Sequence, residues 1–233
     1  MIPDGWQPPP PGLVVNAKHK AMEALRAGGP HAAQDRLARF YDTDGDYAGA
    51  SFAQLDPIDP MDITAADLLA TTLLSVRIKP SATRRILDGG STRDTLLRKL
   101  HDLPDCDLAN AGSPALTAMA GLYEAAKQAL SADTVRNPNA WVTASKLCAR
   151  KRPGLFPVRD KEVCDYLGLT QVRNYQVDWQ VFRSLIGDPD IIAAIDVMSK
   201  ATAAATAGRR LQADQSRLRL LDAAIWTYAM SLR

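Results

Sequence analysis

The sequence is poor in residues that mark several common protein classes. Its 233 residues include only three cysteines, widely spaced and without a Cys-x-x-Cys pair: Cys106, Cys148 and Cys164. This number and spacing exclude a disulfide framework and a zinc knuckle, and they favour a reducing compartment. The three histidines are isolated, and no two of them have metal-ligand spacing: His19, His31 and His101. We therefore expect neither a metal nor a cofactor.

Long apolar runs and common catalytic motifs are also missing. No stretch approaches the ~18–20 apolar residues that a membrane helix needs, and residues 1–12 form a proline-rich segment instead of an export signal. These absences predict a soluble, cytoplasmic protein with no membrane partner. The sequence also lacks a Walker-type phosphate loop, a Gly-x-Gly-x-x-Gly turn and a Gly-x-Ser-x-Gly nucleophile elbow.

What the sequence does contain is a series of apolar, helix-like stretches separated by short breakers. With 46% hydrophobic and 23% charged residues, the chain can bury a sizeable core. Because no stretch sustains the period-two alternation of a strand, we predict an all-α protein, a single domain over residues 1–233 with roughly ten helices. An irregular or short β segment is expected only near residues 42–62, where aspartate is frequent.

Capping signals predict several helix boundaries. Thr64 and Asp67 form a Thr-x-x-Asp capping box before an apolar helix, which we expect Pro80 to end. Residues 161–167 form a short helix that Gly168 closes. The last two helices are predicted to begin at Asp188 and Asp214.

Basic residues are concentrated in one part of the chain. Between positions 146 and 161 the only acid is Asp160, and there are six cations: Lys146, Arg150, Lys151, Arg152, Arg159 and Lys161. Since the net charge of the whole chain is only +2, this local excess predicts a directed contact with a polyanion such as DNA. The alternative is a solvated helix face. Whether a second basic cluster also contacts DNA stays open: Arg209, Arg210, Arg217 and Arg219.

Residues 137–169 combine a helix start, a helix, a basic turn and a second helix: NPNAWVTASKLCARKRPGLFPVRDKEVCDYLGL. This segment resembles the helix-hairpin-helix base-excision DNA glycosylases, in which a hairpin ending in Thr-Ala precedes a helix and a turn with a catalytic aspartate. Thr143-Ala144, Asp160 and Leu167-Gly168 follow the spacing of that family. Together with residues 63–69 and 220–226, the same segment also resembles an uncharacterised bacterial family of unknown function.

The glycosylase resemblance implies a catalytic role for Asp160, since a carboxylate can stabilise the sugar cation that forms when an N-glycosidic bond breaks. Val142 stands where bifunctional members carry a lysine, so the implied enzyme is a monofunctional glycosylase without lyase activity. It would act, as a monomer, on a damaged or modified base in double-stranded DNA, with a role in defence if the modification is that of a phage. The six cations would bind the DNA backbone, and three aromatic residues are candidates for stacking on a flipped base: Trp141, Tyr47 and Tyr166.

Two observations support other interpretations. Residues 138–140 are Pro-Asn-Ala, where the family hairpin has glycines that let backbone N–H groups approach a phosphate. The chain could therefore be a non-catalytic helical domain that binds nucleic acid or another protein. Asp160 could also be simply the N-cap of helix 161–167, because aspartate is favoured at that position. A cleft beside its carboxylate would distinguish a site residue from a mere cap.

Overall fold

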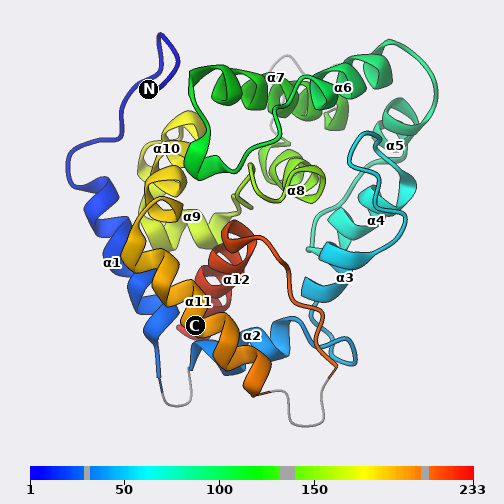
Figure 1. The fold of residues 1–233 in the computed structure, drawn as a ribbon. Helices are drawn as coiled ribbons and strands as arrows, with labels where there is room; N and C mark the ends of the chain where they lie inside the picture. The colour runs from blue at the N-terminus through cyan, green and yellow to red at the C-terminus, as the bar shows by residue number, and fades with distance from the viewer. Residues whose placement is uncertain (29–31, 132–139, 206–209) are drawn as a thin grey trace.

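Twelve α-helices and no sheet make up the described part of the chain, which in this computed structural model comprises residues 1–28, 32–131, 140–205 and 210–233 (Figure 1). The all-α prediction is thus confirmed. The first seven helices are α1 (Leu13–Arg26), α2 (Ala33–Phe40), α3 (Gly49–Gln54), α4 (Ala65–Leu73), α5 (Pro80–Leu87), α6 (Ser91–His101) and α7 (Ser113–Leu130). The others are α8 (Trp141–Lys151), α9 (Lys161–Leu167), α10 (Tyr175–Ile186), α11 (Pro189–Ala204) and α12 (Arg217–Ser231).

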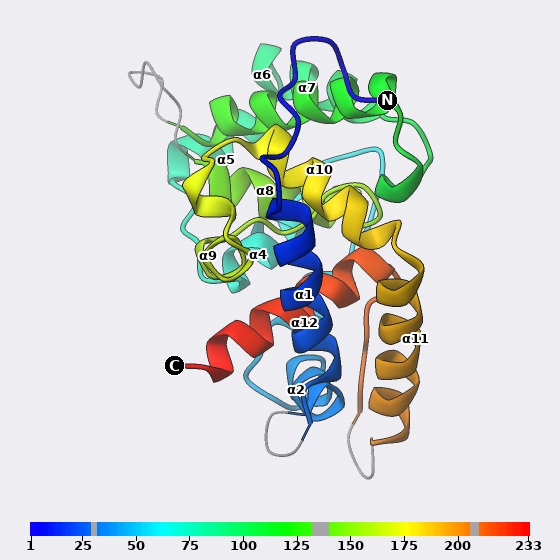
Figure 2. The ribbon, with the colours of Figure 1, turned by 90° about the vertical axis from the view of Figure 1, so that its left-hand side faces the viewer.

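The pair α8 and α9 lies between two groups of helices and connects them (Figures 1 and 2). Helix α8 packs against α7 and α4, whereas α9 packs against α12 and α1. One continuous cluster of buried apolar side chains extends from α1 to α12 through this pair. The turn that joins α8 to α9 is itself buried over residues 155–160. Its side chains are therefore held by both groups of helices.

The predicted caps of α4 and α9 are confirmed. The Thr64 hydroxyl accepts a hydrogen bond from the Asp67 amide, and the Asp67 carboxylate accepts one from the Thr64 amide, which completes the capping box. Asp160 is the N-cap of α9, and Gly168 ends this helix with a φ of 79°. A left-handed residue at this position suits glycine because no Cβ is present to clash.

Two predicted boundaries were wrong. The helix that begins at Ala65 already ends at Leu73, and Pro80 is instead the first residue of α5. Proline suits a first helical position because the N–H that it lacks would have no partner there. The last helix has Ser216 as its N-cap, while Asp214 accepts a hydrogen bond from the Ser216 amide.

The aspartate-rich segment 42–62 contains a helix that the sequence did not reveal. Helix α3 is only six residues long and is anchored by Phe52, which is buried in the core. The extended structure of this segment is a single bridge between Asp42 and Leu211. The proline-rich N-terminus lies against α10, where the Trp6 and Trp179 ring centroids are 6.2 Å apart. The hairpin residues Pro138 and Asn139 lie outside the described residues.

Candidate functional site

Asp160 is both a helix cap and a wall of a cavity. Its Oδ1 accepts a hydrogen bond of 3.0 Å from the Val163 amide, which satisfies one of the free N–H groups at the start of α9. The residue is 8% exposed, and it lines a cavity of about 520 Å³. The cap and the site residue, which the sequence presented as alternatives, are thus compatible in one side chain.

This cavity, here named the Asp160 pocket, is built from segments that are distant in the sequence. Helix α8 contributes Val142 and Lys146, and α12 contributes Asp222 and Trp226. Further walls come from the end of α2 with the following loop and from the end of α4 with its loop: Phe40, Asp46, Tyr47, Ala48, Leu73, Leu74, Ser75 and Val76. A volume of several hundred Å³ is typical of small-ligand sites.

Burial and the neighbouring polar groups shift the pKa of Asp160 in opposite directions. Burial raises the pKa of the Asp160 carboxyl, while the hydrogen bond from the Val163 amide and the Lys146 ammonium act to lower it. Burial lowers the pKa of Lys146, and the Asp160 carboxylate opposes that shift. The Lys146 ammonium donates a hydrogen bond of 2.6 Å to the Leu74 carbonyl, so a cation is fixed at the wall of the pocket. Lys146 thereby differs from a solvated lysine in a surface patch.

Asp222 is a second carboxyl of this pocket that sequence reasoning missed. Its Oδ2 accepts hydrogen bonds from the Val158 amide (2.8 Å) and from Arg219 Nη1 (2.6 Å). Burial raises the pKa of Asp222 to about 7. The signal was present in the sequence, because Asp222 interrupts the apolar run of residues 220–226. A carboxyl placed in the buried stripe of a helix is a candidate functional group.

Aromatic side chains form one side of the Asp160 pocket. The Tyr47 and Trp226 ring centroids lie 6.3 Å apart in an edge-to-face arrangement, and Phe40 lies 5.7 Å from Trp226. Tyr47 is 50% exposed, so its ring is accessible from solvent. Tyr47 was a predicted stacking residue, whereas Trp226 was not recognised. Such a wall offers flat apolar surface to a planar ligand.

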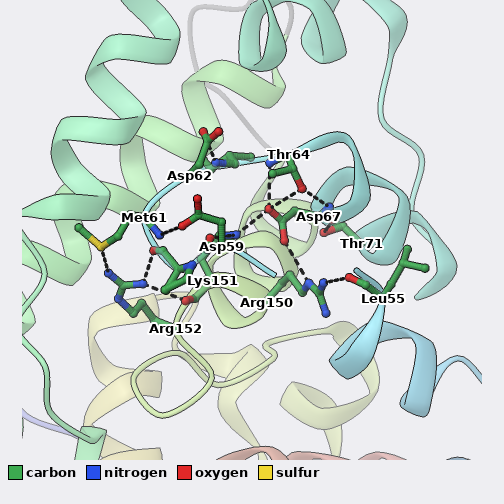
Figure 3. Close-up of polar contacts among 12 residues, drawn as sticks. Leu55, Asp59, Met61, Asp62, Thr64, Asp67, Thr71, Arg150, Lys151 and Arg152 are labelled. Atoms are coloured by element: carbon green, nitrogen blue, oxygen red, sulfur yellow. Dashed lines mark hydrogen bonds and ion pairs between the residues drawn. The ribbon is translucent and has the colours of Figure 1, made fainter. Parts of the chain in front are cut away.

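Most of the predicted DNA-binding cations are buried. Arg150 Nε and Lys151 Nζ lie 3.1 Å and 2.6 Å from the two carboxylate oxygens of Asp67, and both cationic side chains are only 2% exposed. Figure 3 shows them pointing from the end of α8 toward Asp67 and the loop before it. Two buried cations around one buried carboxylate hold this loop against α8. They offer no exposed charge to a phosphate.

The other three predicted cations have different surroundings. Arg152 is half-buried and donates hydrogen bonds to the Pro60 and Leu100 carbonyls. Arg159 is buried, and its guanidinium binds the Asp178 carboxylate and the Tyr123 hydroxyl. Lys161 alone is well exposed, with 71% of its side chain accessible, although it pairs with Asp165 at 2.5 Å. Of the six, only Lys161 combines high exposure with a place on the Asp160 pocket.

Trp141 and Tyr166, the other two predicted stacking residues, lie away from Asp160. Trp141 lines a second cavity, here named the Trp141 pocket, of about 630 Å³. Its lining includes aromatic and charged side chains: Tyr123, Lys127, Trp141, Arg159, Asp165, Arg173, Tyr175 and Asp178. The Tyr166 hydroxyl instead donates to the Lys20 carbonyl at 2.9 Å, and its ring packs on Tyr228. Tyr166 therefore fastens α9 to α1 and α12.

In the second basic cluster, each arginine that the structure describes forms an ion pair with an aspartate. Arg210 binds Asp44 and Arg217 binds Asp196, each at 2.8 Å. Arg219 is buried against Asp222, whereas Arg209 lies outside the described residues.

These observations define a helical protein with two cavities beside the turn that joins α8 to α9, and both cavities are lined by carboxyl groups and aromatic rings. The model of a family of unknown function (DUF6308) matches residues 33–229, and the chain belongs to this family. No curated protein and no solved structure gives a significant match. No helix in the described residues is long and apolar enough to cross a membrane.

Proposed function

We propose that the Asp160 pocket hydrolyses the N-glycosidic bond of a damaged or modified base in DNA, as a monofunctional glycosylase does. The observation that carries this proposal is the position of Asp160, whose carboxylate is fixed at the start of α9 and lines a cavity with an aromatic wall. This is the arrangement that the resemblance of residues 137–169 requires of its aspartate. If the base were a phage modification, the reaction would serve defence.

The reaction needs a negative group at the sugar and a place for the base. Cleavage of the bond between C1′ and the base builds positive charge on the sugar, which the Asp160 carboxylate stabilises. The raised pKa of Asp160 makes it a better proton acceptor for the water that attacks C1′. Tyr47 and Trp226 supply the flat surface on which an extruded base can stack.

DNA contacts in this proposal come from exposed cations near the pocket. Lys161 lines it directly, and Arg77 and Lys79 are exposed on the loop that continues from the lining residues Ser75 and Val76. Such charges can bind phosphates while the base enters the cavity. The buried Arg150, Lys151 and Arg159 have no part in this contact.

The test is release of a free base from a panel of duplexes that carry damaged and phage-type modified bases. Asp160→Asn keeps the shape and the capping ability of the side chain but removes its charge, so we expect the fold to persist and base release to cease. Asp165→Asn is the matched control, since Asp165 is an exposed carboxylate of the same helix and we expect it to retain activity. Equal release by wild type and Asp160→Asn would refute the catalytic role of Asp160.

A second measurement examines the absence of lyase activity. Lys146 is the buried amine of the pocket, and its Nζ is held by the Leu74 carbonyl. We expect borohydride reduction during the reaction to trap no covalent protein–DNA adduct. An adduct that Lys146→Met abolishes would instead assign a Schiff-base step to this lysine.

A further inference from the structure

The Trp141 pocket is a separate cavity on the other side of the turn that carries Asp160. Its walls come from α7, from the first residue of α8, from Arg159 in the turn before α9, from α9 itself, and from α10 with the segment before it. The carboxyl groups of Asp165 and Asp178 are among the lining groups. Among the described residues, none lines both this cavity and the Asp160 pocket. A ligand in one cavity therefore contacts a different set of side chains from a ligand in the other.

Three of the lining residues are aromatic: Tyr123, Trp141 and Tyr175. The Tyr123 and Tyr175 ring centroids are 4.6 Å apart, and the Arg159 guanidinium carbon lies 5.3 Å from the centroid of Trp141. Tyr123 is fully buried, whereas Trp141 and Tyr175 are half-buried and partly accessible. The two accessible rings, with a guanidinium beside them, favour a flat π-system as ligand.

The charge of the cavity favours an anionic ligand. Most charged side chains of the cavity already form ion pairs. Arg159 pairs with Asp178, and Asp165 pairs with Lys161. Lys127 pairs with the exposed Glu124. Arg173 is exposed, and its side chain has no ion pair or hydrogen bond with another described residue. Its backbone has a φ of 52°, which is unusual for a residue other than glycine. One uncompensated cation therefore lies at the edge of an aromatic cavity.

We propose that the Trp141 pocket binds a nucleotide, either a free mononucleotide or one residue of a single DNA strand. The base stacks on Trp141 and Tyr175, and the phosphate contacts Arg173 and Lys127. A cavity of about 630 Å³ accommodates a ligand of this size. Single-strand sites elsewhere use the same combination of aromatic stacking and cationic side chains. This proposal does not depend on the reaction assigned to Asp160.

The experiment is isothermal titration calorimetry of the full chain with the four deoxynucleoside monophosphates and, separately, with a short single-stranded oligonucleotide. Arg173→Asn removes the charge with a residue that tolerates a positive φ, so the fold is preserved. Trp141→Leu removes the stacking ring, and its fold is checked by circular dichroism and melting. Arg26→Gln is the matched control, because Arg26 is an exposed cation in the last turn of α1 and does not line this cavity.

We expect the wild type, Arg26→Gln and Asp160→Asn to bind alike, and Trp141→Leu and Arg173→Asn to bind about tenfold more weakly. If the oligonucleotide binds more tightly than any monophosphate, the ligand of the pocket is a DNA strand. If a monophosphate binds more tightly, the ligand is a free nucleotide. No heat of binding with millimolar ligand, or equal affinity of all variants, would overturn the proposal. Binding of inorganic phosphate as tight as that of the nucleotides would overturn the stacking role of the rings. Since Asp160→Asn is expected to retain binding, failure of this proposal is distinguishable from failure of the glycosylase proposal.

Discussion

Arg159 and Asp160 are consecutive in the chain, yet their side chains line different cavities. Arg159 lies among Trp141, Tyr123 and Tyr175, whereas Asp160 lines the Asp160 pocket together with Lys146, whose charge acts on its carboxyl group. The reason is the extended backbone of Asp160, with φ of −118° and ψ of 176°, since successive side chains of extended chain point to opposite sides. A single turn thereby forms part of both candidate sites.

The first prediction concerns the buried carboxylate of Asp67. Asp67→Ala leaves Arg150 and Lys151 buried without a counter-charge, so we expect a loss of about 3–5 kcal/mol in the free energy of unfolding. Urea denaturation measures this loss. Asp62→Ala is a useful comparison, because the Asp62–Arg93 pair is partly exposed and its loss should cost about 1 kcal/mol or less. Similar effects of the two substitutions would contradict the buried network.

The second prediction separates stability from DNA binding in the basic segment. Lys151→Ala with Arg152→Ala should lower the melting temperature but leave the salt dependence of DNA affinity unchanged, because these side chains bind the protein itself. Lys161→Ala should reduce the slope of log affinity against log salt by about one, the effect of a single phosphate contact. Fluorescence anisotropy with a labelled duplex at several salt concentrations measures both slopes. If the slope of log affinity against log salt became flatter in the double variant, Lys151 and Arg152 would contact DNA after all.

The third prediction is a pH dependence of stability caused by Asp222. Burial raises the pKa of Asp222 to about 7 in the folded chain, against about 3.9 in the unfolded chain. Between these values the folded state binds the extra proton, so this group stabilises the fold at low pH and the contribution is lost as pH rises through 7. At about 1.4 kcal/mol per pKa unit, the loss amounts to a few kcal/mol.

Thermal melting from pH 5 to pH 8 measures this effect, and Asp222→Asn should flatten the profile. The pKa values of Asp160 and Asp178 are also raised, so these groups likewise make the fold less stable as pH rises. The difference between the profiles of variant and wild type therefore gives the contribution of Asp222 alone. Identical profiles would show that Asp222 is not protonated in this range.

The fourth prediction concerns the aromatic wall of the Asp160 pocket. Tyr47→Ala should slow base release about tenfold by removing a stacking surface, while Tyr47→Phe should retain it. Because Tyr47 is half exposed, the alanine variant should lose only about 1 kcal/mol of stability. Initial rates under single-turnover conditions, with melting curves beside them, make this comparison. An alanine variant with wild-type rates would exclude Tyr47 from base recognition.

Local signals in the sequence determined much of the secondary structure. The caps of α4 and α9 were predictable because a capping box and a terminal glycine act within three or four residues. Periodic apolar residues identified the long helices for the same reason. Helix α3 was not predicted, because a helix of six residues is stable only when tertiary packing supports it.

The tertiary structure alone decided which charges are available and which residues share a cavity. Arg150 is 83 positions from Asp67, and the Val158 amide is 64 positions from Asp222, so no local pattern reveals that they meet. A run of cations looks the same in sequence whether it faces solvent or binds a buried carboxylate. The sequence by itself therefore determined that Asp160 begins a helix, and only the packing of α8, α9 and α12 placed Lys146, Asp222 and Trp226 around the same pocket.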